Sequence, residues 1–289
     1  MTSDTRGIVY MLLASFFFCL MALSVKLLQG IPVLEVIFFR AVISALLCYW
    51  GIRRAGVAPL GSNRRLLVFR GIAGVLALAQ GIYLIQTIPL AAATTLTHLS
   101  PIFTTLIAIW FVREKVAPIQ LGFFALSFAG VVLIQGFDYR ISVMHLLIGI
   151  SASFCMGLAY NSVRRLGAEE HPLVIMFYFP LVCLPVAALY SVLYWVQPHD
   201  VQWLYLLLVG ITAQLGQYFM TRSYQVANVA RVAIVAYSEV LFAIVLGLLF
   251  FGENFNLLTY AGMALVAVGV VWNMRFKPAS KQAAALPAE

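Results

Sequence analysis

Residues 89–132 read PLAAATTLTHLSPIFTTLIAIWFVREKVAPIQLGFFALSFAGVV, and this stretch decides the fold because the chain contains it twice. The stretch predicts a long apolar helix, a short charged loop that contains Glu114, and a second apolar helix that ends near Gly130. It aligns without a gap with NVARVAIVAYSEVLFAIVLGLLFFGENFNLLTYAGMALVAVGVV at 228–271. Identical residues that keep register beyond shared hydrophobicity are Glu114 with Glu253, Gly130 with Gly269, Val131 with Val270 and Val132 with Val271. We therefore interpret the chain as a duplicated unit.

The composition indicates a protein whose solvent is mostly lipid. Of its 289 residues, 63% are hydrophobic and only 10% are charged, which is too little polar surface to cover a soluble globule. The formal net charge of +8 is explained by basic loops, because no solvated basic domain carries it. The sequence thus predicts a polytopic protein in a lipid bilayer, with no nucleic-acid partner. It leaves open whether the protein is a monomer or a homodimer.

Ten segments are apolar and long enough, at about 20 residues, to cross a hydrocarbon core of about 30 Å. They are residues 7–28, 33–52, 67–87, 91–112, 116–136, 144–163, 173–196, 202–221, 229–251 and 257–276. The expected fold class is an all-α membrane protein with ten transmembrane helices, five in each repeat. The expected domains are 7–137 and 142–276. The tail at 277–289 has no apolar face, so we expect it to be disordered and cytoplasmic.

The positions of lysine and arginine predict the orientation of the chain. With both termini cytoplasmic, fifteen basic residues, Arg70 among them, lie on the inner side, against Lys26 and Arg140 outside. Because each repeat holds an odd number of helices, the second repeat enters the membrane upside down relative to the first. Such inverted repeats are typical of secondary transporters, in which the solute binds between the repeats near the midplane.

No catalytic or metal-binding constellation is visible in the sequence. The cysteines Cys19, Cys48, Cys155 and Cys183 stand singly within apolar spans, and the four histidines have no metal-ligand spacing. No glycine-rich phosphate loop follows a strand, so transport driven by ATP is unsupported. We therefore expect no enzyme activity, no metal and no cofactor.

A charge inside a membrane span is costly, and two charged residues within predicted spans stand out. Arg40 shares a helical stripe with Ser44, and Glu239 lies on a stripe of small residues with Ala243. One interpretation makes them the poles of a substrate site, with Arg40 for a carboxylate and Glu239 for an amine or a proton. The other makes them a structural ion pair, or makes Arg40 a residue that snorkels to the membrane surface.

Polar stripes on other predicted helices are candidates to line the same cavity. In the fourth span Thr94, His98 and Pro101 share one face, and Pro101 predicts a kink that acts as a hinge. Val240 replaces this proline in the second copy, so a kink there is left open. Further candidate ligands are Gln80, Tyr83, Tyr160, Asn161, Gln214, Gln217, Tyr218 and Tyr237. The alternative is that these side chains form hydrogen bonds between helices.

The repeated glutamates have a different interpretation. Glu114 and Glu253 fall in predicted loops, where a charge costs little. We expect them to cap a helix or to form loop ion pairs rather than to bind substrate.

At this level of detail the chain resembles a known family. The paired five-helix units resemble the EamA domain of the drug/metabolite transporter superfamily. Two segments also resemble it: IPLAAATTLTHLSPIFTTLIAIWFVREKV at 88–116 and VAYSEVLFAIVLGLLFFGEN at 235–254. That family's pattern has a proline in the fourth helix, here Pro101, followed by a run of small residues that ends in glutamate. The resemblance implies a transporter with two EamA repeats.

The resemblance indicates the substrate less specifically than it indicates the family. EVIFFR at 35–40, FRG at 69–71 and YSEVL at 237–241 are similar to S-adenosylmethionine uptake transporters and to the animal solute carrier 35 G branch. We expect a secondary transporter of the bacterial inner membrane that moves a small charged or zwitterionic metabolite, of S-adenosylmethionine, carboxylate or amino-acid type, by alternating access. The alternatives are an amino-acid or drug exporter of the same family and a non-transporting membrane scaffold or receptor.

Overall fold

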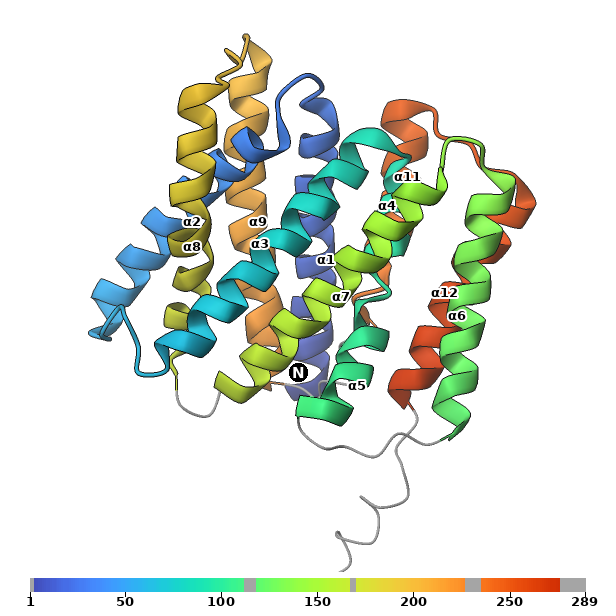
Figure 1. Cartoon of the computed structure of the whole chain (residues 1–289), viewed down its shortest axis with the longest axis horizontal. Helices are drawn as coiled ribbons and strands as arrows, with labels where there is room; N and C mark the ends of the chain where they lie inside the picture. Colours follow the sequence, from blue (N-terminus) through green and yellow to red (C-terminus); the bar gives the residue numbers. More distant parts are fainter. Residues whose placement is uncertain (1–2, 112–117, 167–169, 227–234, 276–289) are drawn as a thin grey trace, which may run out of the picture.

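The computed structural model describes residues 3–111, 118–166, 170–226 and 235–275, and Figure 1 shows that they form a bundle of helices. No strand occurs in this part of the chain. The helices are α1 (Ser3–Leu27), α2 (Val33–Ala55), α3 (Arg64–Thr87), α4 (Leu90–Thr97), α5 (Ser100–Phe111), α6 (Pro118–Phe137), α7 (Val143–Leu166), α8 (Pro172–Leu193), α9 (Val201–Val226), α11 (Ser238–Phe251) and α12 (Leu257–Arg275). Glu114 and the tail at 277–289 lie outside the described residues.

Six of these helices, namely α1, α2, α3, α7, α8 and α9, contain stretches long and apolar enough to cross a membrane. Shorter apolar stretches lie within α6, α11 and α12, at Gly122–Ile134, Ser238–Phe251 and Leu257–Gly269. The predicted all-helical, multi-pass membrane architecture is confirmed. The number of ten spans stays a prediction, since residues 227–234 of the expected ninth span are outside the described part.

The helices of the two halves interleave. The pairs α1 with α9, α2 with α8, α3 with α7 and α6 with α12 pack against each other. Figure 1 shows α3 and α7 running side by side across the front of the molecule, and α6 beside α12 at its right-hand edge. Each pair joins a helix of the first half to one of the second, so the boundary between the halves runs through the whole bundle.

The predicted fourth span is not one continuous helix. α4 ends at Thr97 and α5 begins at Ser100, so the break falls at His98 and Leu99, just before Pro101. Proline has no amide hydrogen to donate to the preceding turn, so it is tolerated in the first turn of a helix and is a physical reason for a new helix to begin here. Whether Pro101 acts as a hinge stays a prediction.

The second copy has a similar break without a proline. Ala236 and Tyr237 form a turn immediately before α11, although Val240 stands at the position that corresponds to Pro101. Residues 227–234, which precede this turn, lie outside the described part, so a kink of the whole span in the second copy stays a prediction. A proline is not required for the turn, so the surrounding tertiary contacts must also hold this conformation.

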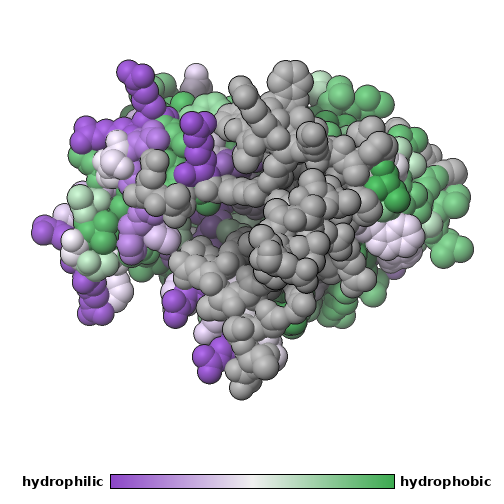
Figure 2. Space-filling model, turned by 90° about the horizontal axis from the view of Figure 1, so that it is seen from below, coloured by the Kyte–Doolittle hydropathy of each residue, from purple (hydrophilic) through white to green (hydrophobic). Residues whose placement is uncertain are grey.

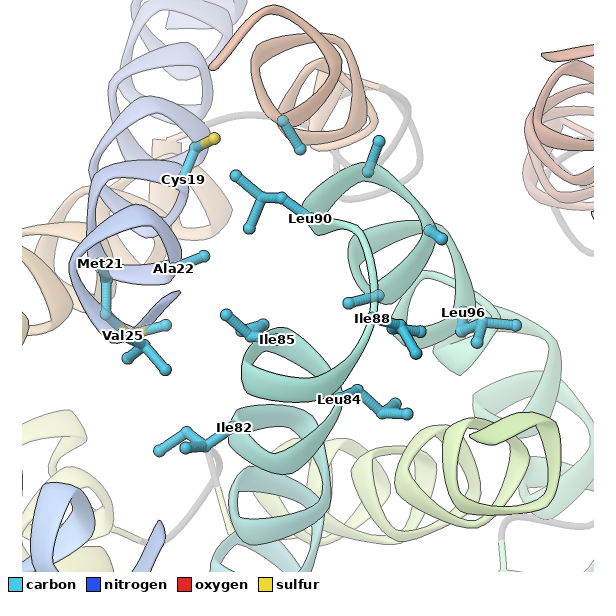
Figure 3. Packing of buried hydrophobic residues seen from close by; sticks show 14 of the residues in the cluster. Cys19, Met21, Ala22, Val25, Ile82, Leu84, Ile85, Ile88, Leu90 and Leu96 are labelled. Carbon is cyan, nitrogen blue, oxygen red and sulfur yellow. The ribbon is translucent and has the colours of Figure 1, made fainter. Parts of the chain in front are cut away.

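Part of the buried core lies where α1, α3 and α4 converge. Figure 3 shows Ile85 of α3 and Leu90 of α4 pointing toward α1, on the side of Ala22. Leu96 points to the opposite side of α4, and both leucines are fully buried. Packed apolar side chains of this kind fix the position of α4, and with it the break at His98.

A buried ion pair ties together the upper end of the bundle in Figure 1. The Nζ atom of Lys26 lies 2.7 Å from Oε1 of Glu253, and it also donates a hydrogen bond of 2.7 Å to the carbonyl oxygen of Ile88. The backbone N–H of Leu90, the first residue of α4, donates to Oε2 of Glu253 over 2.8 Å. The expected ion pair of Glu253 is confirmed. The expectation of a solvated loop charge is wrong, because only 6% of the Glu253 side chain is exposed.

The opposite end of the bundle is rich in exposed basic residues. Arg53 and Arg54 end α2, and Arg64 and Arg65 begin α3, at the end where α1 also begins. Figure 2 views this end and shows hydrophilic residues gathered on its left-hand side, while hydrophobic residues cover the right-hand side. This distribution agrees with the basic inner face that the sequence predicts.

Close contact between α6 and α12 depends on glycine. A Cβ atom at Gly130 would lie 2.6 Å from the carbonyl oxygen of Gly262. At Gly269, which corresponds to Gly130 in the second copy, a Cβ atom would lie 2.7 Å from the carbonyl oxygen of Phe123. The repeated glycine therefore permits the backbones of two membrane helices to approach closely.

We expect Gly130→Ala to lower the free energy of unfolding by about 1–3 kcal/mol, since the added methyl group overpacks the contact. Gly122→Ala on the same helix is the matched control, because a Cβ atom there has no neighbour within 4 Å. Alanine is intrinsically better than glycine in a helix, so the control should melt at the wild-type temperature or slightly above it. Thermal melting of the purified variants in detergent tests this expectation. Equal melting temperatures for the two variants would show that the α6–α12 contact can accommodate an added methyl group without loss of stability.

Candidate functional site

Two adjacent cavities lie inside the bundle. The larger, of about 220 Å³, is lined by residues from α1, α2, α3, α4, α5, α7, α9 and α11. The smaller, of about 130 Å³, lies between α2, α3, α7, α8 and α9. Arg40, Tyr160 and Gln217 line both cavities. Helices of both halves thus contribute to two neighbouring cavities that share lining residues.

The structure brings most of the predicted site residues together. The larger cavity is lined by Arg40, Thr94, His98, Tyr160, Gln217, Tyr237 and Glu239, and Gln214 lines the smaller one. These residues come from separate segments of the chain, and the interleaved packing of the two halves gathers them.

Four predicted site residues lie elsewhere and line neither cavity. The Nε2 atom of Gln80 donates to Oγ of Ser151 on α7, and Nδ2 of Asn161 donates to the carbonyl oxygen of Thr104 on α5. Tyr83 and Tyr218 are exposed on the outside of the bundle. The alternative of hydrogen bonds between helices describes Gln80 and Asn161 better than solute contact does.

Glu239 lies in the first turn of α11 and faces the break of the first copy. Its Oε2 atom is 3.8 Å from Nε2 of His98, and the two side chains are 19% and 15% exposed. The other ring nitrogen of His98, Nδ1, lies 2.9 Å from the carbonyl oxygen of Thr94. This contact orients the imidazole toward Glu239. The N-terminal end of a helix also favours a carboxylate in its first turn.

The two helix breaks contact each other at the cavity. The hydroxyl group of Tyr237 donates a hydrogen bond of 2.6 Å to the carbonyl oxygen of His98, and the two rings lie 5.2 Å apart in an edge-on arrangement. His98 belongs to the break between α4 and α5, while Tyr237 belongs to the turn before α11. The irregular backbone of both copies therefore lines a polar cavity, which is where membrane proteins tolerate it.

Arg40 is buried without an anionic partner. Its side chain lies over the ring of Phe179, with 5.4 Å from Cζ to the ring centroid. Its Nε and Nη1 atoms are buried and have no hydrogen-bond partner. No ion pair joins Arg40 to Glu239 within the described structure, so the alternative of a structural pair is not what the geometry shows. The two residues line the same cavity and are both available to a solute.

Arg70 is a site residue that the sequence analysis missed. It lies within α3 and lines the smaller cavity together with Gly74 and Ala77, one and two turns further along the same face. Its Nε and Nη1 atoms are also buried and unpartnered. The available signal was this stripe of small residues beside an arginine that lies three residues inside the predicted span 67–87.

Chemically, the cavities offer two guanidinium groups, one carboxylate and several neutral donors and acceptors. No group of three or more metal-binding side chains occurs among the residues that the structure describes. The arrangement is suited to binding a small molecule that carries groups of both charges.

Comparison with known sequences gives a family match. The model of the EamA-like transporter family matches residues 5–136 and 143–275, one match in each half. This agrees with the resemblance inferred from the repeated stretch.

Two similar proteins have names that describe transporters. The Pseudopaline exporter CntI of Pseudomonas aeruginosa is 34% identical over 279 residues, which cover 94% of this chain and 96% of the exporter. Human Solute carrier family 35 member G1 is 28% identical over 266 residues, covering 86% of this chain and 73% of the carrier. A crystal structure that is 18% identical superposes with a TM-score of 0.63 and covers 93% of this chain and 94% of that one, which shows a shared fold.

Proposed function

Because the chain belongs to the EamA-like transporter family, we propose that it is a secondary transporter that moves a small charged or zwitterionic metabolite across the bacterial inner membrane. Membrane transport follows from the family. The substrate class, the alternating-access mechanism and the absence of ATP coupling are our proposal. An amino-acid, a carboxylate and an S-adenosylmethionine type of substrate all fall within this class.

One observation carries the proposal: Arg40 and Glu239 have opposite charges, line the same cavity and form no ion pair with each other. A charge inside a membrane span is costly unless it is compensated. A substrate with a carboxylate and an ammonium group would compensate both. This is the physical reason to prefer a zwitterion to a neutral solute.

The proposed mechanism rests on ten spans arranged as two inverted repeats, with both termini cytoplasmic. In this arrangement α4 and α5 together form the fourth span, and α11 belongs to the ninth. Broken helices at the midplane are typical of transporters built from inverted repeats, whose halves rock around a fixed site. The Lys26–Glu253 pair would then close the outer end.

Substrate counterflow in proteoliposomes tests the proposal. Purified protein should exchange at least one radiolabelled amino acid, carboxylate or S-adenosyl compound, without ATP, and Arg40→Leu should abolish the exchange. A scaffold or receptor would move none of them. The name of the Pseudomonas aeruginosa relative supports export as the direction, which uptake into inside-out vesicles measures.

A further inference from the structure

Arg40 and Arg70 form a pair of positive charges in the smaller cavity. Arg40 comes from α2 and Arg70 from α3, and both line the cavity of about 130 Å³. They are near enough for their charges to interact electrostatically. Two like charges that meet inside a membrane protein repel each other, so the arrangement needs a compensating partner.

The described part of the protein supplies no such partner. No carboxylate forms an ion pair with either arginine within the described residues, and four of their guanidinium nitrogens are buried without a hydrogen-bond partner. The other polar groups that line this cavity, such as Ser44 and Gln214, are neutral. Buried donors and charges without partners are costly, and proteins usually keep them only where something else binds.

We propose that Arg40 and Arg70 together bind a doubly negative group of the substrate, either two carboxylates or one phosphate. This inference rests on the proposed function, and it narrows the substrate to a molecule with two acidic charges at one end. Guanidinium groups keep their charge and offer a planar fork of donors that matches carboxylate and phosphate oxygens. Gly74 and Ala77, on the same face of α3 as Arg70, are small residues that leave room for such a group.

The order of charges along the cavities adds a second feature. Arg70 lines only the smaller cavity, Glu239 lines only the larger one, and Arg40 lines both. An elongated substrate would place its two acidic charges between the arginines and its positive group beside Glu239. A substrate that matches all three residues therefore carries a net charge of −1.

Thermal shifts of the purified full-length protein in detergent test the proposal. The probes are L-aspartate, succinate and inorganic phosphate, compared at equal ionic strength with L-asparagine, succinamate and chloride, which carry fewer negative charges. A ligand that binds the folded state raises the melting temperature. At least one doubly negative probe should bind about tenfold more tightly than its less charged counterpart, and Arg70→Gln should remove this preference.

The carboxylate and phosphate probes show whether the doubly negative group is a pair of carboxylates or a phosphate.

Arg65→Gln, which changes an exposed arginine on the same helix, is the control and should keep the preference for the doubly negative probe. Without ligand, Arg70→Gln should melt no lower than the wild type, because it removes an unpartnered buried charge; an arginine with a structural role would destabilise the protein when replaced. If no doubly negative probe exceeds its control, or if Arg70→Gln retains the preference, the proposal is wrong.

Failure of this inference can be separated from failure of the proposed function. A protein that prefers the doubly negative probes but moves no solute in proteoliposomes keeps the Arg40–Arg70 subsite and loses the transport mechanism. If the wild type and Arg70→Gln exchange a monocarboxylate amino acid equally well, the transport mechanism is supported. The Arg40–Arg70 subsite is then wrong.

Discussion

Lys26→Met is expected to lower the free energy of unfolding by about 3–5 kcal/mol, because it leaves the buried carboxylate of Glu253 without its cation. The carbonyl oxygen of Ile88, at the junction between α3 and α4, also loses the hydrogen bond that it accepts from the Lys26 ammonium. Glu253 meanwhile still accepts from Leu90, the first residue of α4. The ion pair thus connects α1, the start of α4 and the loop that follows α11.

A double-mutant cycle measures the contribution of the pair itself. Lys26→Met, Glu253→Gln and the double variant should show a coupling energy of at least about 1 kcal/mol, since residues in direct contact are not additive. Arg53→Met is the control, because Arg53 is exposed and forms no ion pair in the described structure. If Lys26→Met and Arg53→Met melt at the same temperature, contacts other than this ion pair stabilise the upper end of the bundle.

The fold was largely predictable from the sequence because its signals are local and repeated. The expected span 144–163 corresponds to α7, Val143–Leu166. The span 91–112 was expected to be kinked but continuous, and the structure breaks it at His98. Apolar periodicity continues through such a break, so the pattern alone does not reveal it; only Pro101 indicated it, and the second copy breaks without a proline.

The candidate site was predictable where a charge within a span is costly, as for Arg40 and Glu239. Polar stripes were less informative, because Gln80 bonds to a neighbouring helix and this use follows the same spacing as cavity lining. Arg70 was grouped with the basic residues of the inner side, since arginines near the ends of spans usually determine topology. The burial of Glu253 depends on Lys26, which is remote in sequence, and no local pattern reports such a contact.

Glu239→Gln is expected to abolish the pH dependence of transport while preserving the shape of the cavity. The groups that face this carboxyl are His98 at 3.8 Å, the neighbouring Tyr237, Cys19, Tyr160 and, in the same cavity, Arg40. His98 forms an ion pair with the carboxylate only when its imidazole is protonated, and no lysine or arginine of the described residues forms one. Beside a neutral His98 the carboxyl therefore either carries a proton or binds a cation. We infer that it releases its proton when the positive group of the substrate arrives, and this exchange couples transport to a proton gradient.

The decisive measurement compares counterflow with gradient-driven transport in proteoliposomes between about pH 5.5 and 8, a range that brackets titration of a buried carboxyl group and of histidine. In Glu239→Gln, exchange should persist or weaken evenly at every pH, whereas accumulation driven by the proton gradient should be lost. Glu35→Gln is the matched control, because Glu35 is a fully buried carboxyl on α2 that lines neither cavity and accepts a hydrogen bond from the backbone of Val196. The control should retain the pH profile of the wild type. An unchanged pH profile in Glu239→Gln would mean that Glu239 is a structural partner within the bundle, and the hypothesis that it couples transport to protons would fail.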